Sequence, residues 1–271
     1  MGGFQMEINE KFLKNLAEKY NFLQERYCTE CIEKLNNIQR SDLNLFYSKH
    51  YHYSEIGDIF SNGLLRHIDA GKCLYKQPST KIRKSADIND YYALYYNSNH
   101  QLLISEPVYS HYFKLVTIYF DENIQITYSV DDDGGDSSPQ FRFMEYTEYS
   151  NGNVLSCEKF AKQYNPPYGV EINGEYYEYE GIKLISAIKI ENYNTAYEPF
   201  QNPVLRFEFI PGRILNPDIF YYDFKYDNSE KLICKKTQRY TTECTKENTL
   251  TLVKSEIEKL KKFGVNCFEL Q

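Results

Sequence analysis

The sequence predicts an α+β protein, in which a largely antiparallel β-meander sheet is joined to an N-terminal helical segment and a C-terminal helix that packs on the sheet. Three observations predict it. Apolar residues first recur at helical spacing, later runs alternate apolar and polar residues, and the turns between these runs are short. Because a parallel return needs about a dozen residues or more, short turns indicate antiparallel neighbours.

We expect three parts: a helical segment over 1–72, a basic connector over 73–90 and an antiparallel β domain with its C-terminal helix over 91–271. The first long helix, from about 8 to 38, is predicted by an apolar stripe. Its members are Leu16, Tyr20, Leu23, Tyr27, Cys31, Leu35 and Ile38. A second short helix is expected between an N-cap at Ser54 and a left-handed stop at Asn62 and Gly63.

Alternation predicts the strands. Ile124, Ile126, Tyr128 and Val130 alternate with Gln125, Thr127 and Ser129, which is typical of a strand with one face in water. The run 115–120 is apolar on both faces, so it is expected in the middle of the sheet, covered on each side. Further strands are predicted over 205–209 and 220–226. The final helix is predicted by the stripe Leu250, Val253, Ile257 and Leu260, with a stop at Gly264.

The chain repeats part of itself. Tyr149, Asn151, Leu155, Cys157 and Lys159 recur 77 residues later as Tyr226, Asn228, Leu232, Cys234 and Lys236. Both copies have the pattern of an aromatic-rich strand, a polar turn and a second strand. The sequence therefore predicts two related β-hairpins, and a possible duplication of this unit.

Composition limits the partners. The chain has 271 residues and a net charge of −7, which argues against a general nucleic-acid binder and favours a basic protein partner. Seven cysteines at scattered positions indicate reduced thiols in a cytoplasmic protein. The sequence shows neither a signal peptide nor an apolar run long enough to span a membrane, and no cofactor is implied. The 27 tyrosines suit both sheet surfaces and contact surfaces.

Two groups of residues allow metal binding. Cys28 and Cys31, followed by His50 and His52, have the residue types of a zinc site, but Cys31 belongs to the apolar helix stripe and core packing is the preferred interpretation. The run Asp131, Asp132, Asp133 and Asp136 is interpreted as an acidic partner-binding surface, with a solvated loop as the default and Ca²⁺ binding as a further alternative. It departs from an EF-hand loop, because Asp136 and Arg142 stand where Gly and Glu are required.

No complete catalytic motif occurs: the nucleophile elbow, the zincin motif and the phosphate-binding loop are all missing or broken. We therefore assign no catalytic residue. His100 and His111, at opposite ends of one strand segment, are the alternative acid–base pair.

The two copies of the repeat, 146–159 and 223–236, resemble the tyrosine-rich strand–turn–strand units of immunity proteins from bacterial polymorphic toxin systems. The resemblance implies a non-catalytic cytoplasmic protein that sequesters a toxin-like partner through an acidic, tyrosine-rich surface. It assigns a role to no individual residue. A hydrolase of nuclease or glycosidase type, with a site assembled only in three dimensions, and a carbohydrate- or small-ligand-binding β domain stay open as alternatives.

Overall fold

The structure is a computed structural model, and it describes residues 10–49, 62–65, 68, 91–108, 114–131, 140–163, 169–196, 217–226, 231–240 and 243–262. Helix α1 (Glu10–Asn37) comes first, followed by the short 3₁₀ helix η1 (Arg40–Asp42). Helix α4 (Lys254–Lys262) ends the described chain.

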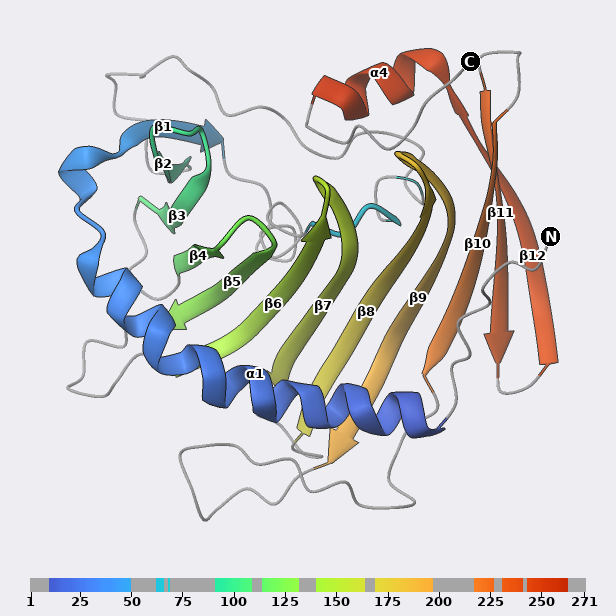
Figure 1. Ribbon diagram of the computed structural model, residues 1–271, viewed down its shortest axis with the longest axis horizontal. Coiled ribbons are helices and arrows are strands. Elements are labelled where there is room, and N and C mark those ends of the chain that lie inside the picture. Colours follow the sequence, from blue (N-terminus) through green and yellow to red (C-terminus); the bar gives the residue numbers. More distant parts are fainter. Residues whose placement is uncertain are drawn as a thin grey trace.

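Between the helices the described strands form one twelve-stranded antiparallel sheet, in which each strand pairs with its neighbours in sequence (Figure 1). Two-residue turns join several neighbours, so the meander follows directly from the short polar turns of the sequence. The strands are β1 (Asn44–Lys49), β2 (Tyr91–Tyr96), β3 (Leu102–Pro107), β4 (Lys114–Phe120), β5 (Ile124–Asp131), β6 (Gln140–Ser150), β7 (Asn153–Gln163), β8 (Gly169–Glu180), β9 (Lys183–Ala196), β10 (Asp218–Tyr226), β11 (Lys231–Tyr240) and β12 (Glu243–Val253).

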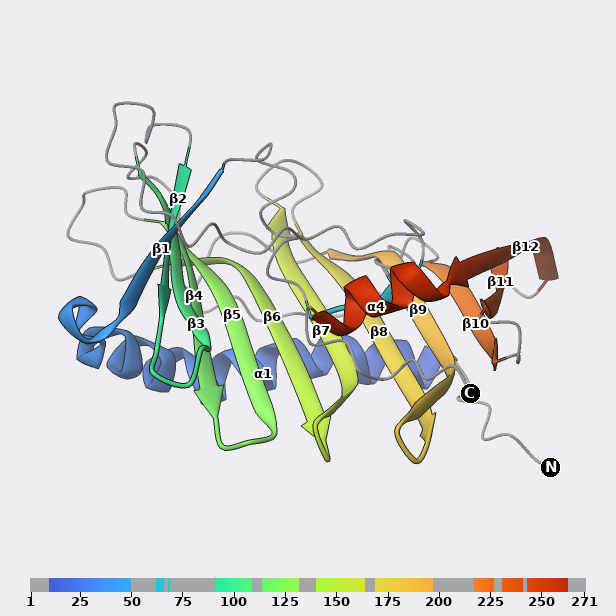
Figure 2. The ribbon, with the colours of Figure 1, turned by 90° about the horizontal axis from the view of Figure 1, so that it is seen from above.

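The two helices lie on opposite faces of the sheet, as Figure 2 shows. Helix α1 crosses the strands from β4 to β9, and we call the side that it covers the α1 face (Figure 1). Helix α4 and the described residues 62–65 and 68 lie on the other side, the opposite face. Each face has its own apolar core.

The core of the α1 face forms as the helical stripe predicted. Leu16, Leu23 and Cys31 are buried and pack on apolar side chains of the sheet such as Ile126 and Ile190. Burying each large side chain contributes about 1.5–3 kcal/mol, so this stripe is sufficient to hold the helix on the sheet. The predicted bounds of 8 to 38 agree with the observed helix within two residues.

The fold class is confirmed in its coarse form: a mostly antiparallel meander with an N-terminal and a C-terminal helix. Strand β1 was not predicted. It lies inside the range 1–72 and pairs with β2, because Leu45 and Tyr47 extend the sheet edge beside the tyrosines of β2. The division into three parts stays a prediction.

The C-terminal helix was predicted to begin too early. Leu250 and Val253 lie in β12, which pairs with β11, and α4 begins only at Lys254. The reason is the alternation of threonine with leucine and valine over 249–253, which favours a paired strand. The predicted left-handed stop is also wrong, since positive φ among the described residues occurs at neither Asn62 nor Gly63.

The wet face predicted for β5 is wrong. Ile126, Tyr128 and Val130 are buried in the core of the α1 face, but Gln125, Thr127 and Ser129 on the other side are also buried, at 8%, 1% and 0% exposure. Alternation shows that a strand has one polar face, but it does not show whether another part of the chain covers that face. By contrast, β4 is buried on both faces, as predicted.

The two repeated hairpins have the same register. Glu145 pairs with Lys159 and Thr147 with Cys157 in β6–β7, and the residues 77 positions later, Tyr222 with Lys236 and Phe224 with Cys234, pair likewise in β10–β11. The first hairpin turns through Asn151 and Gly152, both with positive φ, as a two-residue hairpin turn requires. A duplication stays a hypothesis, to which this correspondence lends support.

Several predicted features lie outside the described residues: the connector 73–90, Ser54, the strand 205–209 and Gly264. Within the described ranges, no helix has both the length and the apolar composition needed to cross a bilayer.

Candidate functional site

Polar side chains form two rows across the opposite face of the sheet. Residues that pair across antiparallel strands project to the same side, so the register defines each row. The first row runs from β4 to β8 through Thr117, Thr127, Glu145, Lys159 and Asn173. The second row runs from β5 to β9 through Gln125, Thr147, Cys157, Glu175 and Lys189. We call these the polar rows.

Hydroxyl and amide groups satisfy each other at the β4–β6 end of the rows. The Thr117 and Thr127 hydroxyls are 3.0 Å apart, and the Tyr149 hydroxyl donates to Gln125 Oε1 at 2.9 Å. Burial raises the pKa of Tyr149 well above its usual range, which keeps its hydroxyl a donor. This network explains how β5 can bury Gln125 and Thr127, because buried polar groups are tolerated when they are hydrogen-bonded.

Further along, the rows bind the main chain of residues 62–65, which we call the 62–65 segment. The amide N–H of Asn62 donates to Glu145 Oε1 at 2.9 Å, and that of Leu65 donates to Glu175 Oε2 at 3.0 Å. Between them, the Leu64 N–H donates to the Tyr177 hydroxyl at 2.7 Å. Three acceptors on β6 and β8 therefore hold one short stretch of polypeptide.

Side chains complete this attachment. The Asn62 amide donates to Thr147 Oγ1 at 3.1 Å, and the Tyr177 hydroxyl donates to Glu175 in a short hydrogen bond. Burial and the neighbouring Glu175 carboxylate raise the pKa of Tyr177 well above its usual range, so its hydroxyl keeps its proton. The fit is close: a Cβ on Gly63 would lie 2.8 Å from Glu175 Oε1.

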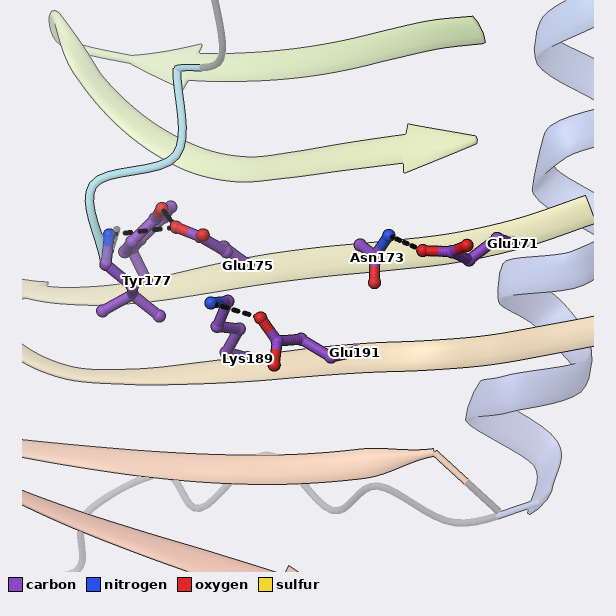
Figure 3. A network of polar contacts seen from close by, with 7 residues as sticks. Glu171, Asn173, Glu175, Tyr177, Lys189 and Glu191 are labelled. Atoms are coloured by element: carbon purple, nitrogen blue, oxygen red, sulfur yellow. Dashed lines mark hydrogen bonds and ion pairs between the residues drawn. The ribbon is translucent and has the colours of Figure 1, made fainter. Parts of the chain in front are cut away.

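The polar contacts continue along β8 and β9 (Figure 3). Asn173 Nδ2 donates to Glu171 Oε1 at 2.9 Å, and Lys189 Nζ lies 2.5 Å from Glu191 Oε1. The Lys189 side chain is 15% exposed and the Glu191 side chain 34%, so this ion pair is partly desolvated. On β7, the ammonium group of Lys159 lies 4.6 Å from the ring centroid of Phe143.

The chemistry of this site is that of an acceptor surface. Glu145 and Glu175 hold main-chain amides, so their oxygens act as hydrogen-bond acceptors inside the fold. Among the described residues, no group of three or more His, Cys, Asp and Glu side chains is arranged to hold a metal ion. The arrangement is therefore suited to holding polypeptide, and here it holds a segment of its own chain.

Several of the candidate residues predicted from the sequence lie outside the described part of the chain. His100 is exposed in the turn between β2 and β3 with φ of 60°, while His111 lies outside the described residues. Asp131 ends β5, and Asp132, Asp133 and Asp136 also lie outside the described part.

The cysteine pair lies on α1. Cys31 is buried in the core of the α1 face, where burial raises the pKa of its thiol to about 12, and Cys28 is half-buried beside it. His50 and His52 lie outside the described residues. Cys31 therefore packs as a residue of the apolar helix stripe.

Sequence reasoning missed the polar rows, although a signal for them was present. The two hairpins share Phe143 with Phe220 and Lys159 with Lys236, and each lysine stacks on its phenylalanine, at 4.6 and 4.5 Å. Between these shared residues, Glu145 and Thr147 of the first hairpin replace Tyr222 and Phe224 of the second. Positions that are polar in one hairpin and aromatic in the other indicate that the two hairpins pack against different parts of the chain.

Comparison with family models, with curated proteins and with solved structures found no match to this chain.

Proposed function

We propose that this chain is a non-catalytic, protein-binding scaffold that sequesters a basic protein partner, as an immunity protein does. One observation carries the proposal. Three carboxylates on the inner strands β6, β7 and β8, two of them buried and one half-buried, are bound by donors of the chain itself. The three are Glu145, Glu158 and Glu175.

A general acid or base must be able to reach a substrate proton. Glu145 and Glu175 instead accept amide hydrogens, and Glu158 accepts the Tyr176 hydroxyl at 3.0 Å and pairs with Lys19. These groups stabilise the scaffold. The net charge of −7 then acts at the surface, where it attracts a basic partner.

The proposal rests on charge rather than on tyrosine. Every tyrosine whose side chain the structure describes is buried or half-buried. Examples are Tyr20, Tyr128 and Tyr222, each at 3% exposure or less. The described tyrosines therefore serve largely to build the sheet and its packing against α1, because a ring with one polar group fits a half-buried position.

Affinity capture tests the proposal. The full chain is immobilised and exposed to an extract of its native host, beside an unrelated protein of equal net charge. We expect a basic protein to be retained by this chain alone and released when salt is raised to about 0.5 M, since screening weakens exposed ion pairs. Retention of nothing, or of the same proteins as the control, would contradict the proposal.

A further inference from the structure

The 62–65 segment reaches its place on the sheet by a long detour of the chain. Strands β1 and β2 pair directly at one edge of the sheet, yet all of residues 50–90 lie between them in sequence. Within this connection, residues 62–65 bind to β6 and β8, beyond β3, β4 and β5. Two paired strands need a turn of only a few residues, and connections longer than about 15 residues are uncommon. The detour therefore brings the segment to a site far from the strands that it joins.

The contacts at this site define which polypeptide it accepts. Main-chain N–H groups of the segment are held by acceptors on β6 and β8, two of which Figure 3 shows. The Asn62 side chain donates to Thr147 Oγ1, and a Cβ on Gly63 would lie 2.8 Å from a carboxylate oxygen of β8. Leu64 and Leu65 are buried in the core of the opposite face. The site therefore selects asparagine and glycine followed by two aliphatic residues.

The site is polar where the second hairpin is aromatic. Tyr222 and Phe224 of β10 lie in an apolar core with Ile257 of α4, whereas the corresponding positions of β6 hold Glu145 and Thr147. Aromatic rings suit a permanent cover, because exposing them to water is costly. Carboxylate and hydroxyl groups are solvated when a cover leaves, and they discriminate between occupants while one is bound. The polar rows therefore suit an occupant that can be exchanged.

We propose that the acceptors on β6 and β8 form a peptide-binding site for a segment of a partner protein, and that the 62–65 segment is its built-in competitor. The partner segment has the chemistry of the seated one: asparagine, glycine and two aliphatic residues, with main-chain N–H groups facing the acceptors. This inference rests on the proposed function and gives it a location.

Displacement of the competitor leaves the sheet intact. The hydrogen bonds of the segment run to side chains of β6 and β8, so its release breaks no pairing between strands. A tethered segment acts at an effective concentration of about 1 mM. The competitor therefore sets a threshold, which a partner exceeds by making further contacts with the protein.

A fluorescent synthetic peptide with the sequence of residues 60–70 tests the inference by anisotropy. Its target is the full chain, either unchanged or with Gly63→Ala, which weakens the competitor because the added Cβ would meet Glu175. A second peptide carries the same glycine-to-alanine change. In the Gly63→Ala chain, Glu175→Gln alters the site. The matched control, Glu178→Gln, removes the same charge from the α1 face of β8, where Glu178 accepts the Ser186 hydroxyl at 2.6 Å.

We expect saturable binding of the unaltered peptide, about tenfold tighter to the Gly63→Ala chain than to the unchanged chain, since a weakened competitor occupies the site less. Glu175→Gln should weaken binding about fivefold, because a charged acceptor becomes neutral, and Glu178→Gln by less than about twofold. The peptide with alanine should bind at least about tenfold less tightly. Should the Gly63→Ala chain fail to fold, Asn62→Ala replaces it, since that change removes the hydrogen bond to Thr147.

Several results would overturn the inference. One is the absence of saturable binding up to about 1 mM, the effective concentration of the competitor. Equal binding to the unchanged and the weakened chain would place the peptide elsewhere on the protein. Equal binding of the two peptides, or equal losses in Glu175→Gln and Glu178→Gln, would show that the site does not select its occupant.

The proposed function can fail separately. If affinity capture retains a specific basic partner, and a saturating concentration of the peptide does not release it, the proposed function stands and the location on β6 and β8 is wrong. If the peptide binds as expected but no partner is retained, the binding site stands and the proposed function fails.

Discussion

Replacing Lys19 by methionine is expected to destabilise this protein more than replacing its partner Glu158 by glutamine. The pair joins α1 to β7 with an Nζ–Oε2 distance of 2.6 Å. Its members differ in burial, since the Lys19 side chain is 30% exposed and the Glu158 side chain 3%. Removing either one therefore leaves its partner in a different environment.

The expected loss in the free energy of unfolding depends on which unpaired group each variant leaves in the fold. Lys19→Met leaves a buried carboxylate with the Tyr176 hydroxyl as its donor, and breaking a buried pair in this way costs about 3–5 kcal/mol. The ammonium group also lies 4.7 Å from the Tyr146 ring, a contact worth about 0.5–1 kcal/mol. Because Lys19 is partly exposed, we expect a total near the lower bound, about 3 kcal/mol.

Glu158→Gln is milder. The freed ammonium group can turn to water, and the glutamine carbonyl still accepts the Tyr176 hydroxyl, so we expect a loss of about 1 kcal/mol. The double variant leaves no buried charge and is expected to be more stable than Lys19→Met alone. Urea unfolding of the four proteins measures all three values. Equal losses in the single variants, or a double loss equal to their sum, would refute this reasoning.

Three further predictions concern single residues. Burial raises the pKa of Tyr119 from 10.0 to about 12, so the folded state keeps a proton that the unfolded state loses, and stability should fall as pH rises from 10 to 12. Urea unfolding should show that Tyr119→Phe reduces this fall by about 2–3 kcal/mol; an unchanged pH profile would contradict it. Burial also raises the pKa of Cys31 to about 12, so at about pH 8 only about one in ten thousand of its thiols is ionised. Because the thiolate is the form that reacts, mass spectrometry should detect alkylation by iodoacetamide on the half-buried Cys28 well before Cys31. Finally, Gly63→Ala should cost about 1–3 kcal/mol in urea unfolding, because its Cβ would lie 2.8 Å from Glu175 Oε1, in a carboxylate held by the Leu65 N–H and the Tyr177 hydroxyl. A loss below about 0.5 kcal/mol would show that the Glu175 carboxylate or the 62–65 segment shifts freely.

The sequence predicted those features of the fold that depend on periodicity. The stripe from Leu16 to Cys31 placed α1 on an apolar core, and the alternating aromatic residues of β10 correctly placed Phe220, Tyr222 and Phe224 on one face. Periodicity gives a wrong element boundary where the same residues fit both a helical stripe and a strand. Leu250 and Val253 fit a helical stripe with Ile257, but pairing with β11 continues the sheet to Val253 before the helix begins.

The comparison of the two hairpins could have indicated that Glu145 and Thr147 are exceptional, but the contacts of the candidate site could not be predicted, because they join residues far apart in the chain. Asn62 meets Glu145 across 83 residues, and Leu64 meets Tyr177 across 113. Nothing in the local sequence of β6 distinguishes Glu145 from the solvent-facing glutamate of an ordinary strand. What decides its burial is the 62–65 segment, which covers it and gives its carboxylate a donor.

The two hairpins show how one local pattern can serve two surroundings. In β10–β11, Tyr222 and Phe224 join the apolar core that includes Ile257 of α4. In β6–β7, the corresponding Glu145 and Thr147 face Asn62, whose main-chain and side-chain amides need acceptors that an aromatic ring does not provide. Burying a polar group is costly unless it is hydrogen-bonded, so each hairpin can use only the side chains that its covering segment satisfies. The difference between the copies therefore reflects what lies over the sheet, and it explains why the internal repeat indicates the architecture of the hairpins but not what covers each of them.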